Sequence, residues 1–411
     1  MQIKKINIFL STLNFILSFV GYQMVTVIFL PVSSDIDGLS RKVTIPYRLI
    51  TLIISIIVIL INFKKPIAKS STAFKILLLY WLFLIIRIIY DLYFSPNVFI
   101  SDKSQLWLYV FGICLPALIS TLKSYEYIAF DKLFLWVFLG TLISALIAFF
   151  SNAIWLSESL SRQSGNIALN TISLGHLGAS GILLSMYGIA QKKNNLKIKL
   201  LLSLSLVLFL ITLLRAGSRG PLVSLIVVIF FWIFSSSHKM ILNLSIVTFI
   251  IIFLYLNINS ILNFINNLSP IMAERLNATI LEGDTSERNP IYQTAIQFFL
   301  ENPLLGKQFA IFDNSGSFKY AHNIILDSFM GLGILGGFMM IYILWTGVKD
   351  SYFIINRKDS NYWICLILIQ QIMMNMTSGA FYYNPLLSVL LTFVYIHIYN
   401  KKNTYDYCKE S

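Results

Sequence analysis

Long, continuous hydrophobic runs dominate this chain and decide which kinds of fold are open to it. Leu49–Ile61 and Leu222–Phe234 are examples, and neither alternates apolar with polar residues. Runs of this kind cross a bilayer as α-helices, whereas an outer-membrane β-barrel has short alternating segments. Charged residues make up only 12% of the chain, about half the usual fraction for a soluble domain. The sequence therefore predicts an all-α, polytopic membrane protein.

About twelve transmembrane helices are expected, and together they form one integral membrane domain over residues 1–411. The expected spans are 6–30, 45–63, 73–94, 105–122, 133–155, 167–190, 198–214, 219–235, 240–257, 322–347, 361–378 and 384–400. The first span follows the basic start Met1–Lys5, but it is too long for a signal peptide and has no small-residue cleavage site, so we expect it to be retained. One long segment, 258–321, separates two spans.

The distribution of Lys and Arg predicts the orientation, because short cytoplasmic loops are enriched in both. The bias places both termini in the cytoplasm and the segment 258–321 outside. On the inner side every basic residue except Arg357 is Lys, whereas seven of the eleven on the outer side are Arg. Arginine's planar fork binds phosphate oxygens in pairs, which a lysine ammonium does not do. An anionic, phosphate-bearing ligand that approaches from outside is therefore expected.

Two other partners could account for the +13 net charge. Attraction to lipid headgroups is the simpler alternative for the outer arginines. Nucleic acid is not expected, because these arginines lie in short loops without interleaved exposed aromatic residues.

A glycine-rich turn with two arginines joins the seventh and eighth spans. It reads Arg215-Ala216-Gly217-Ser218-Arg219-Gly220-Pro221, and Gly-Pro can open the next helix. Arg219 then lies at a helix N-terminus, where free N–H groups and the helix dipole favour an anion. The alternative is a pair of arginines that snorkel at the membrane edge.

The long outer segment contains Arg275, Arg288, Lys307, Lys319 and His322. Asn289-Pro290 after Arg288 opens a helix on which Ile291, Ala295, Ile296, Phe299 and Leu300 recur at helical spacing. We expect an amphipathic helix along the membrane surface that ends near Asn302-Pro303. Its start again places an arginine where a phosphate would bind, although a salt bridge with Glu287 would explain Arg288 equally well.

His322 and Asn323 open the tenth span at the outer membrane edge. A neutral histidine there can accept a proton from a sugar hydroxyl, whereas a capping or lipid-interface histidine is the plainer alternative. His176 is expected to be packed and hydrogen-bonded within the sixth span. His238 and His397 are expected to face the cytoplasm without a special function.

Charged pairs elsewhere have both functional and structural explanations. Arg87 and Asp91 are one helical turn apart in the third span, so they are candidates for a site or for a structural ion pair. Asp35 and Asp37 could hold a divalent cation, but the sequence Asp-Ile-Asp-Gly favours an ordinary turn. Cys114, Cys365 and Cys408 lack metal or redox spacing and are expected to be unpaired.

The ordered set of motifs resembles the O-antigen ligase and polymerase superfamily. The set comprises the Ser-Arg-Gly turn at Arg219, Arg288 with the following helix, Asn302-Pro303-Leu304-Leu305-Gly306, His322-Asn323 and the glycine-rich Gly331–Gly337. The resemblance covers roughly Thr212–Trp345.

The resemblance implies a membrane glycosyltransferase fold of the C type that uses no metal or other cofactor. It implies a glycan carried on undecaprenyl diphosphate as the substrate, with a chain-length regulator and a flippase as possible partners. Arg219 and Arg288 would neutralise the diphosphate leaving group and His322 would act as the base, with Arg215 as a second candidate for the turn arginine. Arg275, Arg87, Asp91 and Asn323 are further candidates.

Three functions remain open from the sequence. A polysaccharide polymerase at the outer face of the bacterial cytoplasmic membrane is favoured, because Thr377–Asn384 is uncharged whereas ligases often carry more polar residues in this late outer loop. An O-antigen ligase that moves polymer to lipid A-core is the sister alternative. A transporter or flippase of a lipid-linked anion is the alternative of another class, but no internal symmetry supports it. Tyr382 and Tyr383 could stack on sugar rings or lie at the interface.

Overall fold

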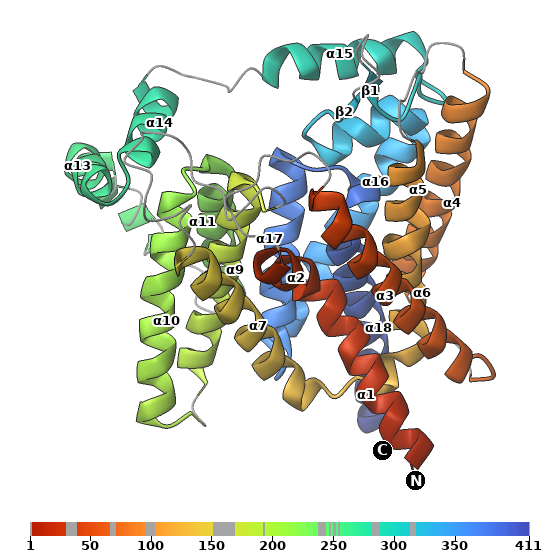
Figure 1. Ribbon diagram of the computed structural model, residues 1–411, viewed down its shortest axis with the longest axis horizontal. Helices are drawn as coiled ribbons and strands as arrows, with labels where there is room; N and C mark the ends of the chain where they lie inside the picture. Colours follow the sequence, from red (N-terminus) through yellow and green to blue (C-terminus); the bar gives the residue numbers. More distant parts are fainter. Residues whose placement is uncertain are drawn as a thin grey trace.

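The computed structural model is a bundle of long helices with a cap of shorter elements at one end (Figure 1). It describes residues 2–29, 39–65, 71–95, 103–150, 169–191, 194–236, 244–245, 248–249, 252–253, 255–281, 288–312 and 318–410. Both termini lie at the end of the bundle opposite the cap (Figure 1).

The bundle is formed by two stretches of the chain, which the cap elements separate. The first half supplies α1 (Gln2–Ile16), η1 (Leu17–Gly21), α2 (Tyr22–Phe29), α3 (Leu39–Ile61), α4 (Thr72–Tyr93), α5 (Lys103–Tyr109), η2 (Val110–Cys114), α6 (Leu115–Ser124), η3 (Tyr125–Tyr127) and α7 (Phe130–Phe150). The second half supplies α9 (Thr171–Ala190), α10 (Leu196–Arg215), α11 (Arg219–Ser236), α16 (Ile324–Asn356), α17 (Tyr362–Thr377), η4 (Phe381–Tyr383) and α18 (Pro385–Glu410).

The all-α, multi-pass architecture is confirmed. Within the described ranges, nine helical stretches are long and apolar enough to cross a membrane. Two more of the expected spans coincide with α17, which is shorter, and with α18. The expected span 240–257 lies mostly outside the described residues, so the total of twelve stays a prediction.

The outer surface of the bundle is apolar in the way that a lipid-facing surface is. On α3 the side chains of Leu49, Ile50 and Ile53 are exposed, and α10 exposes Leu200 and Leu204 in the same manner. A soluble monomer rarely exposes a continuous apolar surface of this extent. These helices therefore have a hydrocarbon environment as their natural solvent.

Polar side chains inside the bundle are paired between helices. The side-chain amides of Asn7 on α1 and Asn62, just after α3, donate to each other at 2.8 and 2.9 Å. Asn14 donates to Ser120 on α6 and accepts from Ser55 on α3. Such hydrogen bonds satisfy polar groups that neither lipid nor an apolar core can satisfy, and here they fix the packing of α1, α3 and α6.

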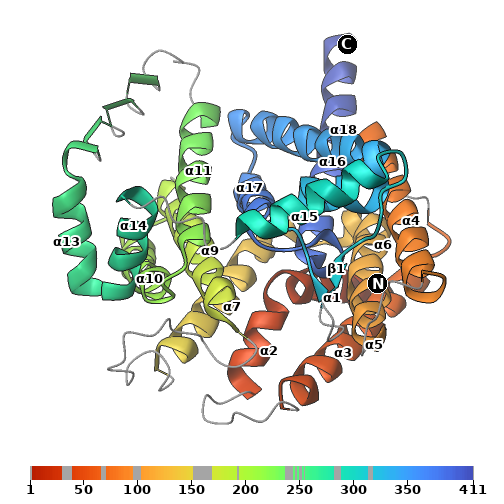
Figure 2. The same cartoon turned by 90° about the horizontal axis from the view of Figure 1, so that it is seen from above.

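The cap consists of the elements between α11 and α16. They are α13 (Ile258–Leu268), α14 (Pro270–Leu281), α15 (Arg288–Glu301) and the antiparallel pair β1 (Ile311–Phe312) and β2 (Phe318–Lys319). Seen from above, α15 crosses over α16, whereas α13 and α14 lie beside α10 (Figure 2). α15 therefore lies across one end of the bundle, and its position along a membrane surface stays a prediction.

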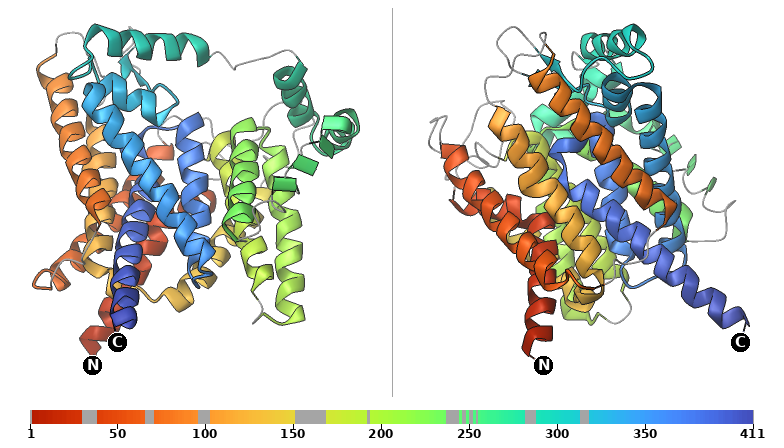
Figure 3. Two further views of the ribbon diagram at one scale, coloured as in Figure 1. Left: turned by 180° about the vertical axis from the view of Figure 1, so that it is seen from behind. Right: turned by 90° about the vertical axis from the view of Figure 1, so that its right-hand side faces the viewer.

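Helix α16 is broken at Gly333, and the turn after α15 fills the break. Gly333 has φ 66° and ψ −159° inside the helix. The Lys307 N–H donates to the Met330 carbonyl oxygen at 2.9 Å, and the Ile334 N–H donates to the Pro303 carbonyl oxygen at 2.8 Å. The Asn-Pro-Leu-Leu-Gly turn and the glycine-rich stretch thus meet backbone to backbone. α4 packs beside α16 (Figure 3).

Candidate active site

The turn between α10 and α11 is held from above by α14. α10 ends at Arg215 and α11 begins at Arg219, as the Gly-Pro signal predicted, and Gly217 between them has φ 58°. The Arg219 guanidinium donates to the Arg275 carbonyl oxygen at 3.2 Å and to the Thr279 hydroxyl, while Arg275 donates to the Gly217 carbonyl oxygen at 3.4 Å. Two of the predicted arginines therefore lie together, and both are half-buried.

Arg288 is the first residue of α15, which confirms the predicted helix start. The inner face of α15 differs from the expected one. Ala295 is buried and Phe299 packs its ring against Phe329 of α16 at 5.2 Å, but Ile296 and Leu300 are exposed. The helix uses its inner face to pack on α16, so those two side chains point away from the protein.

His322 lies in a tight turn that delivers the chain into α16. Its φ of 53° is left-handed, which costs a non-glycine residue about 1–2 kcal/mol. The side-chain oxygen of Asn323 accepts hydrogen bonds from the N–H groups of Ile325 and Leu326, so Asn323 caps α16. Asp327 accepts from the Ala321 N–H at 2.6 Å. These contacts fix the backbone on both sides of the histidine.

The surroundings of the His322 ring favour its neutral form. The ring lies 4.5 Å from the Tyr320 ring, measured between centroids, and its Nδ1 is buried without a hydrogen-bond partner among the described residues. Partial burial lowers the pKa of His322, and the positive charges of Arg288 and Lys319 lower it further. A neutral imidazole at physiological pH can accept a proton.

Contacts at the end of α17 connect the arginine turn with the histidine. A Cβ at Gly220 would lie 3.3 Å from the Thr377 hydroxyl oxygen, so the start of α11 touches the end of α17. The next residue, Ser378, forms a hydrogen bond with Tyr320, and Tyr320 lies against His322. The turn and the histidine were predicted separately, and the end of α17 lies between them.

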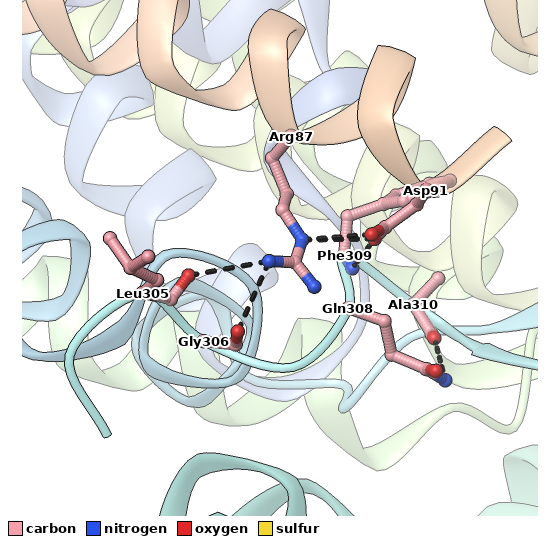
Figure 4. A network of polar contacts seen from close by, with 7 residues as sticks. All are labelled: Arg87, Asp91, Leu305, Gly306, Gln308, Phe309 and Ala310. Carbon is pink, nitrogen blue, oxygen red and sulfur yellow. Dashed lines mark hydrogen bonds and ion pairs between the residues drawn. The ribbon is translucent and has the colours of Figure 1, made fainter. Parts of the chain in front are cut away.

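Arg87 and Asp91 form the predicted ion pair, and they also hold the turn after α15 (Figure 4). Arg87 Nε lies 3.0 Å from Asp91 Oδ1, and its Nη1 donates to the Gly306 carbonyl oxygen at 3.1 Å. Asp91 accepts from the Phe309 N–H at 2.7 Å. Both side chains are therefore engaged in positioning the segment that follows Arg288's helix.

We expect Asp91→Ala to lower the free energy of unfolding by about 3–5 kcal/mol, because it leaves Arg87 and the Phe309 N–H without their partner. Denaturant unfolding of the purified protein in detergent measures this. The double variant Arg87→Leu, Asp91→Leu should lose less than the sum of the two single changes. Asp131→Ala, at an exposed position in α7, is the control. A loss below 1 kcal/mol for Asp91→Ala would contradict the prediction.

Two histidines differ from what the sequence suggested. His176 is buried, but neither ring nitrogen has a hydrogen-bond partner among the described residues, so the expectation of a hydrogen-bonded side chain is wrong. His397 is buried between the Tyr125 hydroxyl at 2.5 Å and the Asp359 carboxylate at 3.1 Å. Hydropathy alone does not reveal such partners, which come from distant helices.

Other candidates are not brought into the site or lie outside the described part of the chain. Asp35, Asp37 and Glu287 belong to segments that the structure does not describe. Cys114 and Cys365 are buried and free, as expected. Asp327 was not predicted, although an acidic residue in the first turn of an apolar span is a signal that could have found it.

One comparison with known proteins identifies the central part of the chain. Residues 204–341 match the family model described as O-antigen ligase, and this range contains Arg215, Arg219, Arg275, Arg288 and His322. No curated protein matches the sequence. The match, the motif order and the many apolar helices agree, and together they support a multi-pass membrane protein whose residues 204–341 form a domain of the O-antigen ligase and polymerase superfamily.

Proposed function

We propose that this protein is a polysaccharide polymerase that transfers a glycan from undecaprenyl diphosphate onto a lipid-linked repeat unit. The observation that carries the proposal is the lowered pKa of His322. Partial burial and the positive charges of Arg288 and Lys319 favour the neutral form of its imidazole. A proton acceptor next to fixed positive charge suits a reaction in which a hydroxyl loses a proton and a diphosphate departs.

The proposed reaction is one displacement at the anomeric carbon of the donor sugar. The acceptor hydroxyl oxygen forms the new bond to that carbon, and its proton passes to a ring nitrogen of His322. The bond between the anomeric carbon and the diphosphate oxygen breaks, and undecaprenyl diphosphate leaves with the electron pair. Arg288 and the cluster of Arg219 and Arg275 would stabilise the charge that develops on it, with Arg215 as a further contact.

The proposed setting is the outer face of the bacterial cytoplasmic membrane, with both termini in the cytoplasm. The excess of Lys on the terminal side and of Arg on the cap side supports this orientation. A flippase that delivers the lipid-linked unit and a chain-length regulator are the proposed partners.

A ligase is the second candidate, because the matched family model is described as O-antigen ligase. The two activities share the donor and differ in the acceptor. The uncharged segment Thr377–Asn384, which borders the site through Ser378, offers no charged side chain for the phosphates of a lipid A-core. This feature favours the polymerase.

The surface-glycan ladder of cells that lack the gene distinguishes these functions. Collapse of the ladder to a single capped repeat unit, restored by the wild type and not by His322→Ala, supports the polymerase. Long chains that remain on undecaprenyl diphosphate indicate the ligase. An unchanged ladder with stable variant protein would overturn glycosyl transfer altogether and favour transport of a lipid-linked anion.

The acid limb of the pH profile should report His322. Because burial, Arg288 and Lys319 lower the pKa of His322, kcat/KM should stay high below pH 6.5 and fall only as the ring becomes protonated at lower pH. Removing one positive neighbour by Lys319→Ala should raise this pKa and move the acid limb to higher pH. Lys307→Ala, which removes a charge paired with Glu301, should not move it. Identical limbs in all three proteins would exclude His322 as the base.

A further inference from the structure

A cavity of about 340 Å³ lies within the bundle, beside the candidate site. Residues from η1, α2, α3, α5, η2, α9, α17, η4 and α18 line it, together with Tyr320 from the turn before α16. The volume falls in the range of small-ligand sites, which is about 300–1,000 Å³.

The lining of this cavity is polar and aromatic, but it is uncharged. Its described lining residues include no Asp, Glu, Lys or Arg. They include five tyrosines and five side-chain amides, namely Tyr22, Tyr47, Tyr109, Tyr320, Tyr383, Gln23, Asn170, Gln371, Asn375 and Asn384. The described lining residues themselves carry no charge, although the buried Arg48 guanidinium lies against the Tyr109 ring. Flat aromatic faces and amides fit a ligand with both apolar faces and hydroxyl groups.

Three buried polar atoms of the lining have no protein partner among the described residues. They are the Nδ1 and Nε2 of His176 and the Oδ1 of Asn375. The His176 side chain is 2% exposed and Asn375 is fully buried. A buried polar atom without a hydrogen-bond partner is destabilising, so these atoms are suited to a ligand that supplies hydrogen bonds. A neutral imidazole offers one donor and one acceptor, which a pair of hydroxyl groups can satisfy.

The aromatic wall of the cavity is held rigidly. The Arg48 guanidinium lies 3.9 Å from the centre of the Tyr109 ring, and the Tyr383 ring lies 4.6 Å from the same ring. Tyr47 donates its hydroxyl to the Leu17 carbonyl oxygen at 2.7 Å. A preorganised wall reduces the entropy that a ligand must lose on binding.

Tyr320 joins the cavity to the candidate base. Its side chain lines the cavity, forms a hydrogen bond with Ser378 and lies 4.5 Å from the His322 ring. The Tyr320 ring therefore contacts both the cavity and the candidate base, whereas Arg219, Arg275 and Arg288 are not among the lining residues.

We propose that this cavity is a saccharide-binding site that holds an uncharged sugar residue of the glycan through His176, Asn375 and the tyrosine wall. The proposal rests on the proposed function and adds to it that two separate sets of residues bind the two parts of the substrate. The arginines bind the diphosphate, and the cavity recognises the sugar next to the new bond.

Calorimetric titration of the full-length protein in lipid nanodiscs tests this division. The two probes are inorganic pyrophosphate and the repeat-unit oligosaccharide released by mild acid from the lipid-linked pool of the producing cells. His176→Phe and Asn375→Ala should each weaken oligosaccharide binding at least tenfold and leave pyrophosphate binding unchanged. Arg288→Ala should do the reverse. Ser185→Ala is the matched control, because Ser185 is also buried on α9 with an unpartnered hydroxyl but lies outside the cavity lining.

Each outcome supports or overturns the cavity site. The absence of oligosaccharide binding by the wild type, or equal binding by His176→Phe and Asn375→Ala, overturns it. Displacement of the oligosaccharide by undecaprenol would make the cavity a lipid-tail site and also overturn it. The two experiments can also disagree. If oligosaccharide binding depends on His176 and Asn375 but deletion of the gene leaves the glycan ladder unchanged, the saccharide site stands and the proposed function is overturned.

Discussion

Purified Arg288→Ala should transfer glycan about 10²–10³-fold more slowly than the wild type, with little change in thermal stability. Removing one fixed group that stabilises developing charge costs about this much in other enzymes. Arg288 stands at the start of α15, within electrostatic reach of His322. Arg288→Lys should recover part of the rate, because it keeps the charge but loses the paired hydrogen bonds of the guanidinium. Turnover of the lipid-linked donor in proteoliposomes measures all three.

Lys307→Ala is the control for Arg288→Ala. Lys307 is a basic residue close to the end of the same helix, and its ammonium pairs with Glu301 at 2.5 Å. We expect its removal to change turnover less than threefold. A similar loss in both variants would mean that the general positive charge of the cap, and not Arg288 itself, supports the reaction.

The Gly333→Ala variant should lose about 3 kcal/mol or more of stability and also lose activity. The backbone of Gly333, with φ 66° and ψ −159°, lies in a region essentially limited to glycine, where other residues pay about 1–3 kcal/mol. A Cβ there would also lie 2.3 Å from the Leu304 carbonyl oxygen, which belongs to the backbone of the docked turn. The Cβ is fixed by the backbone of α16 and the oxygen belongs to backbone, so neither can move without separating the turn after α15 from α16. Denaturant unfolding in detergent measures the loss.

Gly347→Ala on the same helix separates this effect from a general cost of alanine in α16. A Cβ at Gly347 would lie 2.8 Å from the end of the buried Leu391 side chain and not from backbone. A side-chain end shifts more easily than backbone, so we expect a smaller loss than for Gly333→Ala. If the two alanine variants were equally stable, the turn would not depend on the break at Gly333.

Local signals predicted the ends of the functional helices. Each of these signals restricts the backbone conformation or caps the first free N–H groups at one position, and they are Gly220-Pro221, Asn289-Pro290 and Asn323. The corresponding helices, α11, α15 and α16, begin at Arg219, Arg288 and Ile324. Caps and prolines act within one turn of helix, so no knowledge of the rest of the fold was needed.

The rotation of each helix and its long-range partners could not be predicted in this way. In a membrane, side chains that face lipid are as apolar as those that face the core, so periodicity does not tell which face of α9 carries His176 inward. The contact of Arg219 with Thr279 joins residues 60 positions apart. The saccharide cavity draws on nine elements and the turn before α16, and no single stretch of sequence records it.

Helix α15 is anchored at its C-terminal part, so a small tilt moves Arg288 at its N-terminus. Its C-terminal part is fixed by Ala295, by Phe299 and by the turn that Arg87 and α16 hold. From Ala295 to Arg288 the helix extends ~10 Å, so a tilt of about 5° at the anchor displaces Arg288 by close to ~1 Å. Misplacement on this scale can cost about 10²-fold in rate. We therefore expect the rate of the proposed transfer to depend on the backbone contacts at Gly306 and Gly333, which hold the end of α15 far from Arg288.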